Sequence, residues 1–133
     1  MSMLIDHVQV SCAPGGEDAA RRFYVDGLGM IEQPKPPVLA ARGGAWFQSG
    51  EAWIHVGVED DFRPARKAHP ALAVDDVDAL AARLTDLGFP ITWDDAIPGL
   101  RRFHTVDGNG NRVELQAQRA PDTRAKVAWW RPR

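Results

Sequence analysis

Four side chains of metal-ligand type stand in four separate stretches that alternate like β-strands. In each stretch the ligand-type residue falls opposite the aliphatic residues, because neighbouring side chains of a strand point to opposite faces. One such residue alone is more typical of a solvated sheet face or a satisfied sheet histidine. Four together point to a metal site. The four, with their stretches, are His7 (4–11), His55 (51–58), His69 (68–74) and Glu114 (112–118).

This set of ligands suits a divalent ion. Two or three imidazoles and one carboxylate can hold Zn²⁺, Ni²⁺, Mn²⁺ or Fe²⁺ and leave positions open for a substrate with neighbouring oxygens. Such an ion acts as a Lewis acid. Three protein ligands would resemble the triad of iron oxygenases, whereas four favour proton-transfer or lyase chemistry. His55 decides between these, as a fourth ligand or a catalytic base, unless its ring only packs against Trp46 or Trp53.

A hairpin is predicted over residues 102–118, with its turn at 107–111. The turn is rich in Gly, Asn and Asp, which tolerate positive φ. Glu114 then points away from Val113 and Leu115. His104 alternates with Arg102 on the preceding strand. If its face looks inward, His104 lines the same cavity as a catalytic acid or base, or as a substrate contact; a partly exposed strand histidine is an equally open interpretation.

Length and composition bound the class of protein. The 133 residues, 44% of them hydrophobic, predict one domain with an ordinary core. A net charge of −2 offers no footprint for nucleic acid, and no stretch is long enough to span a membrane. The first residues lack the pattern of a signal peptide, so a cytoplasmic location is expected. Cys12, the single cysteine, is interpreted as structural.

The chain reads as the same unit twice. His55 and Glu114 are separated by as many residues as Gly29 and Gly88, and His7 and His69 keep nearly the same offset. The order strand, helix and three strands in both halves indicates a duplicated βαβββ unit. The first module, about 1–59, holds expected strands at 3–11, 30–33, 45–48 and 51–58, a helix at 17–27 and a proline-rich edge or loop at 34–37. The linker is 60–67, and the second module, 68–118, holds expected strands at 68–74, 90–93, 102–106 and 112–118 and a helix at 76–87.

These segments together resemble the vicinal oxygen chelate superfamily, which includes glyoxalase I, bleomycin-resistance proteins and extradiol dioxygenases. The resemblance rests on DHVQV, FYVDGLGM, GGAWFQSGEAWIHVGVE, AHPALAV and DGNGNRVELQ. It implies an α+β fold in which the curved mixed sheets of two tandem βαβββ modules form a barrel-like metal cavity, within one chain or across a homodimer. It also implies metal ligands at His7, His69 and Glu114, with His55 at the fourth position.

Two classes of function follow from this resemblance. The first is a metal-dependent enzyme of the lyase, isomerase, dioxygenase or thiol-transferase kind, acting on a small oxygen-rich molecule. The second is a metal-free protein that sequesters a ligand, as bleomycin-resistance members do. The ligand-type residues favour the enzyme. Gln9 departs from the fosfomycin-resistance pattern, which has threonine there.

Two basic segments flank the predicted modules. In the linker, Arg63, Arg66 and Lys67 are either simply solvated or collect an anionic substrate at the cavity mouth. The tail 119–133 is basic and carries Trp129 and Trp130. Adjacent tryptophans favour packing against the domain or a partner subunit over exposure to water.

Overall fold

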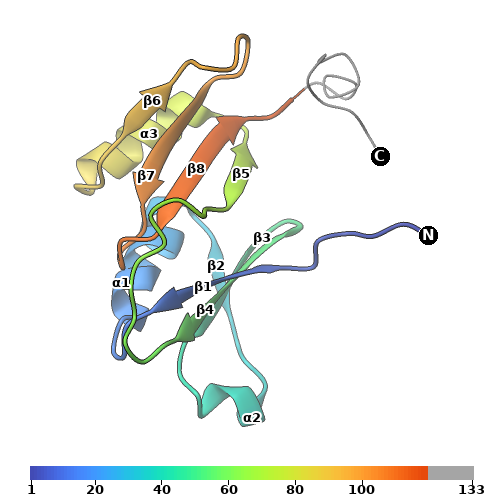
Figure 1. Ribbon diagram of the computed structural model, residues 1–133, viewed down its shortest axis with the longest axis vertical. Coiled ribbons are helices and arrows are strands. Elements are labelled where there is room, and N and C mark those ends of the chain that lie inside the picture. Colours follow the sequence, from blue (N-terminus) through green and yellow to red (C-terminus); the bar gives the residue numbers. More distant parts are fainter. Residues whose placement is uncertain (120–133) are drawn as a thin grey trace.

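The structure is a computed structural model that describes residues 1–119. Two four-stranded mixed sheets stand one above the other, each with a parallel and two antiparallel pairings (Figure 1). Their strand orders are β1-β4-β3-β2 and β5-β8-β7-β6, so the second sheet repeats the first. The duplicated βαβββ unit is therefore confirmed. The first sheet contains β1 (Val8–Cys12), β2 (Ile31–Gln33), β3 (Ala45–Ser49) and β4 (Ala52–Val58); the second contains β5 (Ala71–Val74), β6 (Thr92–Asp94), β7 (Arg102–Val106) and β8 (Arg112–Ala117).

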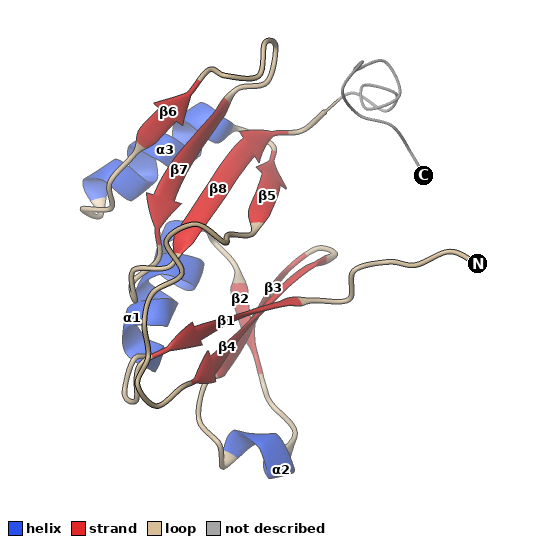
Figure 2. Ribbon diagram, viewed as in Figure 1, coloured by secondary structure: helices blue, strands red, loops and turns tan. Residues whose placement is uncertain are grey.

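Helices connect the strands and supply much of the core (Figure 2). They are α1 (Glu17–Arg21), the π-helix η1 (Arg22–Gly27), α2 (Pro37–Ala40) and α3 (Val77–Asp86). Asp76 caps α3 by accepting a hydrogen bond from Ala79 N at 3.0 Å, which satisfies one of the free amide groups of the first turn. No described helix is long and apolar enough to cross a membrane.

A single apolar core joins the two modules. Phe23 of η1 packs edge-on against Phe89 of the second module, with ring centroids 5.1 Å apart, and Tyr24 stacks on Phe47 of β3 at 5.2 Å. Gly27 lets η1 approach α3 closely, since a Cβ there would lie 2.7 Å from Leu84. Ala20, Phe23 and Tyr24 are the buried side chains of this helical segment and form the face that enters the core.

The turn between β7 and β8 fastens the second module to the first. Asp107 accepts a hydrogen bond from the Tyr24 hydroxyl at 2.9 Å, and Asn111 donates one to Ser11 O at 2.7 Å. Gly108 sits so close to α1 that a Cβ would lie 2.0 Å from Ala19 O. The sequence predicted this turn as a hairpin; the structure adds that it is the main polar contact between the modules.

Several predicted boundaries are wrong in ways that backbone chemistry explains. The strand expected from residue 68 begins at Ala71, after Pro70, which has no N–H to donate to a sheet. Likewise the strand expected at 90–93, which would start on Pro90, runs from Thr92 to Asp94. The strand expected from residue 3 begins at Val8, where pairing with β4 starts. His7 and His69 therefore lie just before their strands.

Three further features differ from the sequence prediction. The helix expected at 17–27 is α-helical only to Arg21 and continues as the π-helix η1. The proline-rich segment contains the short helix α2, which starts at Pro37, where the missing N–H costs nothing. The two sheets do not close into a barrel within the chain; they remain two separate sheets (Figure 1).

Candidate metal centre

The polar face of the second sheet brings three ligand-type side chains together. Glu114 and His104 are register partners on β8 and β7, and His69 lies next to the start of β5, which pairs with β8. The imidazole and carboxylate ligand atoms of the three residues all lie within 4.8 Å of one another. This cluster of His69, His104 and Glu114, called the 69/104/114 cluster below, is the candidate metal centre.

Distances within the cluster fit a metal coordination sphere. Glu114 Oε1 lies 3.0 Å from His104 Nε2 and 3.4 Å from His69 Nε2. Ligands about 2.1 Å from one ion stand roughly 3.0 Å apart at an octahedral edge and roughly 3.4 Å apart at a tetrahedral one. Glu114 Oε1 and each of the two imidazoles are thus spaced as two ligands of one divalent ion would be.

The His69 ring is oriented as a metal ligand would be. Its Nδ1 lies 2.8 Å from the carbonyl oxygen of Lys67, which fixes the proton on Nδ1 as donor. Its Nε2 lies 3.4 Å from Glu114 Oε1 and, in the neutral ring, turns its lone pair towards that carboxylate. A cation between these two atoms would be bound by both.

Arg102 is the counter-charge of the cluster. Its guanidinium donates to Glu114 Oε1 and to Asp94 Oδ2, both at 3.0 Å. Asp94 has a lowered pKa, first because Ala96 N donates to it and then because of the nearby positive groups Arg102, His104 and Arg112. Arg102 thus gives the two carboxylates on this face one shared positive partner. Sequence reasoning did not single out Arg102 or Asp94, although both share the polar face predicted for His104.

His7 and His55, also predicted for the site, meet each other in the first sheet instead. Their rings stack with centroids 3.9 Å apart, and His55 stacks on Trp46 at 4.1 Å on its other face. They line a cavity of about 720 Å³ together with Trp53, Lys35 and Arg42. Within one chain this histidine pair lies apart from the 69/104/114 cluster, which does not include it.

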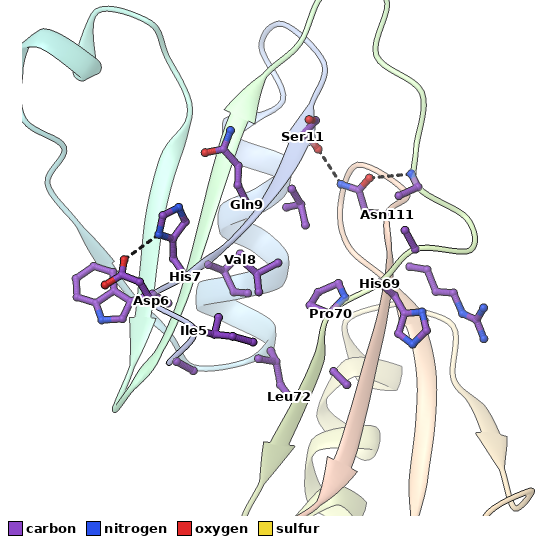
Figure 3. A pocket seen from close by; sticks show the side chains of 18 of the residues that line it. Ile5, Asp6, His7, Val8, Gln9, Ser11, His69, Pro70, Leu72 and Asn111 are labelled. Carbon is purple, nitrogen blue, oxygen red and sulfur yellow. Dashed lines mark hydrogen bonds and ion pairs between the residues drawn. The ribbon is translucent and has the colours of Figure 1, made fainter. Parts of the chain in front are cut away.

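A groove of about 750 Å³ separates the two sets of residues. Figure 3 shows His7 on the β1 side of this groove and His69 on the β5 side, with Leu72 and Pro70 between them on the apolar floor. Beside the groove, Asn111 ties Ser11 O to the backbone N–H of Ala65. Each sheet of the chain thus carries half of the residues that the sequence assigned to one site.

The predicted faces of the strands are seen in what their side chains contact. Ile54, Val56, Val113 and Leu115 lie in the hydrophobic core, whereas His55 and Glu114 are also buried but contact polar and aromatic side chains outside that core. Phe47 is fully buried, and Trp46 and Trp53 line the cavity beside His55.

Cys12 is fully buried, and burial raises the pKa of its thiol, in keeping with the structural role expected of it. The tail prediction for Trp129 and Trp130 lies outside the described residues.

His55 provides a prediction on pH. Burial, followed by the charge of His7, lowers the pKa of His55 below its ordinary value of 6.5. At pH values below 6.5 the imidazole of His55 takes up a proton more readily in the unfolded chain than in the folded one. The free energy of unfolding is therefore expected to decrease as the pH falls below 6.5. His55→Phe, which keeps the stacking, is expected to flatten the fall. Urea unfolding of both proteins at neutral and mildly acidic pH measures this, and equal pH slopes would contradict it.

The fold and the cluster together define a class of protein, in which a duplicated βαβββ unit carries ligand-type side chains on the polar faces of its sheets. The sequence model of the Glyoxalase/Bleomycin resistance protein/Dioxygenase superfamily matches residues 4–115. The chain therefore belongs to this superfamily, as its resemblance to the vicinal oxygen chelate proteins predicted. No curated protein matches the sequence.

Solved structures agree with the family. A glyoxalase family protein from Bacillus anthracis is 43% identical, with a TM-score of 0.85 over 90% of this chain and 98% of that one. Two more distant structures share the fold. A mutant of the fosfomycin resistance protein FosX from Listeria monocytogenes, complexed with Mn(II) and 1S,2S-dihydroxypropylphosphonic acid, is 18% identical (TM-score 0.69, 95% and 98% covered). Lactoylglutathione lyase from Agrobacterium tumefaciens is 21% identical (TM-score 0.61, 83% and 91% covered).

Proposed function

We propose that this protein is a divalent-metal-dependent enzyme of the lyase or isomerase type that acts on a small oxygen-rich substrate. The observation that carries the proposal is the 69/104/114 cluster, whose spacing and His69 orientation suit one ion. Mn(II) in the related FosX complex supports a divalent ion in this family, while Zn, Ni and Fe suit the same ligands.

An ion in this cluster would supply Lewis-acid stabilisation to substrate oxygens. The surrounding side chains have separate tasks. Glu114 provides the negative charge that holds the cation. Arg102 orients that carboxylate and is itself held by Asp94. His55, whose lowered pKa keeps it neutral near pH 7, is suited to accept a proton from the substrate.

We further propose a homodimer, because His7 and His55 lie apart from the cluster within one chain and a second copy would bring them to it. If the first sheet of one chain faces the second sheet of its partner, the partner's His7 completes the ligand set and His55 lines the same cavity. Four protein ligands favour lyase or proton-transfer chemistry over oxygen activation. The exposed apolar start of the chain supports association: Met3, Leu4 and Ile5 are each more than four-fifths exposed, which is costly for a free monomer.

Light scattering tests the dimer. At micromolar concentration we expect twice the mass of one chain, and Leu4→Asp with Ile5→Asp is expected to shift the equilibrium towards the monomer and weaken metal binding with it. A parent protein that scatters as a monomer would contradict the shared site. The matched control is Val38→Asp, which changes an exposed apolar residue on α2, far from the groove.

The proposal is tested by metal titration. Protein stripped with a chelator is expected to bind one Mn²⁺ or Zn²⁺ per chain in isothermal titration calorimetry and to unfold at a lower temperature than the metal-loaded form, since an ion that binds only the folded state stabilises it. Absence of binding by every divalent ion tried would overturn the enzyme proposal.

A metal-free, ligand-sequestering role is the second candidate, and two observations favour it. Glu114 already has a positive partner in Arg102 without an ion, and Trp46 and Trp53 give the cavity beside His55 aromatic walls. The same titration separates the candidates, because only the enzyme needs the cation. A cytoplasmic location stays a prediction from the sequence.

A further inference from the structure

Next to the 69/104/114 cluster lies a pocket of unbalanced positive charge. It has a volume of about 540 Å³ and is lined by Arg66, Arg112, Thr92 and His104, among other residues. No aspartate or glutamate lines it within the described chain. His104 belongs both to the cluster and to the wall of this pocket, so a ligand in the pocket lies beside the candidate metal.

Backbone hydrogen bonds hold the two arginines in place. Arg112 N donates to Ala65 O at 2.8 Å, and Ala65 N donates to Asn111 Oδ1 at 3.1 Å, so the linker is fastened to the start of β8. Pro64 packs over Gly110, whose φ of +89° and missing side chain leave room for it. Arg66 is therefore presented at the pocket by an ordered segment and is not on a free loop.

The side chains of Arg66 and Arg112 are without a carboxylate partner among residues 1–119, in contrast to two other arginines of the second module. Arg101, just before β7, pairs with Asp78, and Arg102 on β7 pairs with both Asp94 and Glu114. The charge of Arg112 nonetheless reaches the cluster, where it contributes to the field at Asp94. A guanidinium that faces a pocket with no internal partner is available for a carboxylate, phosphate or phosphonate, which it binds with two parallel hydrogen bonds.

The charges around the cluster also favour an anionic ligand. Asp94 and Glu114 carry two negative charges and Arg102 one positive charge, so one negative charge remains. A divalent ion therefore turns the polar sheet face positive, before Arg66 and Arg112 are counted. A neutral substrate would leave this charge uncompensated, whereas an anionic one would neutralise it.

We propose that the pocket of Arg66 and Arg112 binds an anionic group of the substrate while other substrate oxygens occupy the open positions of the metal. The inference rests on the proposed function and narrows it: the substrate is a small oxyanion, carrying a carboxylate, phosphate or phosphonate in addition to its chelating oxygens. Neutral diols and catechols are then poor ligands. Arg66 of the linker thus contributes to substrate recognition, which is the second of the two roles that the sequence left open for it.

The test compares three hydroxy acids that chelate a metal alike but differ at the far end. L-lactate has no second anion, L-malate has a second carboxylate, and 3-phosphoglycerate has a phosphate. Their affinities for Mn²⁺-loaded protein are measured by calorimetry, for the parent and for Arg66→Ala and Arg112→Ala. Arg112→Gln serves as a second variant if Arg112→Ala unfolds. Arg101→Ala removes an equal charge beside β7, outside the pocket, and is the matched control.

We expect malate, phosphoglycerate or both to bind the parent about tenfold more tightly than lactate, since a charge-assisted hydrogen bond contributes about that factor. Each pocket variant should lose most of this advantage and keep its affinity for lactate and for Mn²⁺ within about twofold. Preference for phosphoglycerate alone identifies a phosphate or phosphonate group, and preference for malate a carboxylate.

Equal affinity for all three acids, or an equal loss in Arg101→Ala, would overturn the inference while leaving the metal proposal intact. If no divalent ion binds, the proposed function fails instead. The same three acids are then compared on the metal-free protein, in which both arginines are still present. A preference for the second anion that disappears in Arg112→Ala would still support the anion pocket, and its absence would exclude it.

Discussion

Replacing Glu114 by glutamine is expected to lower the affinity of the protein for Mn²⁺ by at least about 100-fold, because the change removes the one charged ligand while keeping its shape. Glu114 is 5% exposed and its Oε1 is the atom nearest to both imidazole nitrogens of the cluster. Calorimetry on chelator-treated protein gives the affinity, and circular dichroism shows whether the fold is kept.

Asp94→Asn is the matched control for this substitution. Asp94 contacts the same Arg102, but it lies 3.9 Å from Nδ1 of His104, on the side of the ring away from Glu114. Its loss removes an equal charge without removing a proposed ligand, so the affinity is expected to fall by about tenfold, the lower end of the range for residues just outside the ligand set. Similar losses in both variants would show that overall charge, and not coordination by Glu114, holds the ion.

The sequence predicted those features of the site that are set by residues close together in the chain. Alternation along β8 is enough to place Glu114 on the polar face, because a strand has only two faces. The turn at 107–111 also sets the register of the hairpin, in which His104 pairs directly with Glu114. Counting outward from that turn would have brought His104 into the ligand set, whereas alternation alone left it as an acid, a base or an exposed histidine.

The position of His7 and His55 was not predictable in the same way. Their faces follow from local alternation, but their distance from Glu114 depends on how the two sheets are joined. That arrangement is set by long-range contacts, such as Tyr24 with Asp107 and Asn111 with Ser11. No periodicity in the sequence encodes such contacts. The spacing of the repeat therefore identified equivalent positions in the two modules. It did not show that these residues would form one site only with a partner chain, as in the dimer that we propose.

Local backbone chemistry explains the smaller errors in the fold. The apolar positions of residues 19–28 fit a helix equally well whether its last turns are α or π, so η1 could not be distinguished by pattern. The prolines at 34, 36 and 37 correctly excluded a central strand. They did not exclude a helix, because a proline can begin one, as Pro37 does.

The turn between β7 and β8 is important for function as well as for stability, because it links the module of the 69/104/114 cluster to the module of His7 and His55. Asp107 is 3% exposed and its carboxylate accepts four hydrogen bonds, from the hydroxyl of Tyr24, the backbone N–H groups of Asn109 and Asn111, and the Asn111 side chain. The charge of Asp107, after burial, also raises the pKa of Tyr24 well above its ordinary value, so the phenol stays a donor. One carboxylate thus organises the turn that sets the register of Glu114 and links it to η1.

Asp107→Ala is therefore expected to lower the free energy of unfolding by about 3–5 kcal/mol, since it leaves the buried Tyr24 hydroxyl and two turn N–H groups without their acceptor. Tyr24→Phe, which removes one of the four bonds and leaves no donor unpaired, should cost only about 1 kcal/mol. Asp86→Ala, at an exposed position of α3, changes the charge equally and should cost less than about 0.5 kcal/mol. Urea unfolding followed by tryptophan fluorescence and circular dichroism measures all three. Equal stabilities of the Asp107 and Asp86 variants would show that the turn does not hold the modules together.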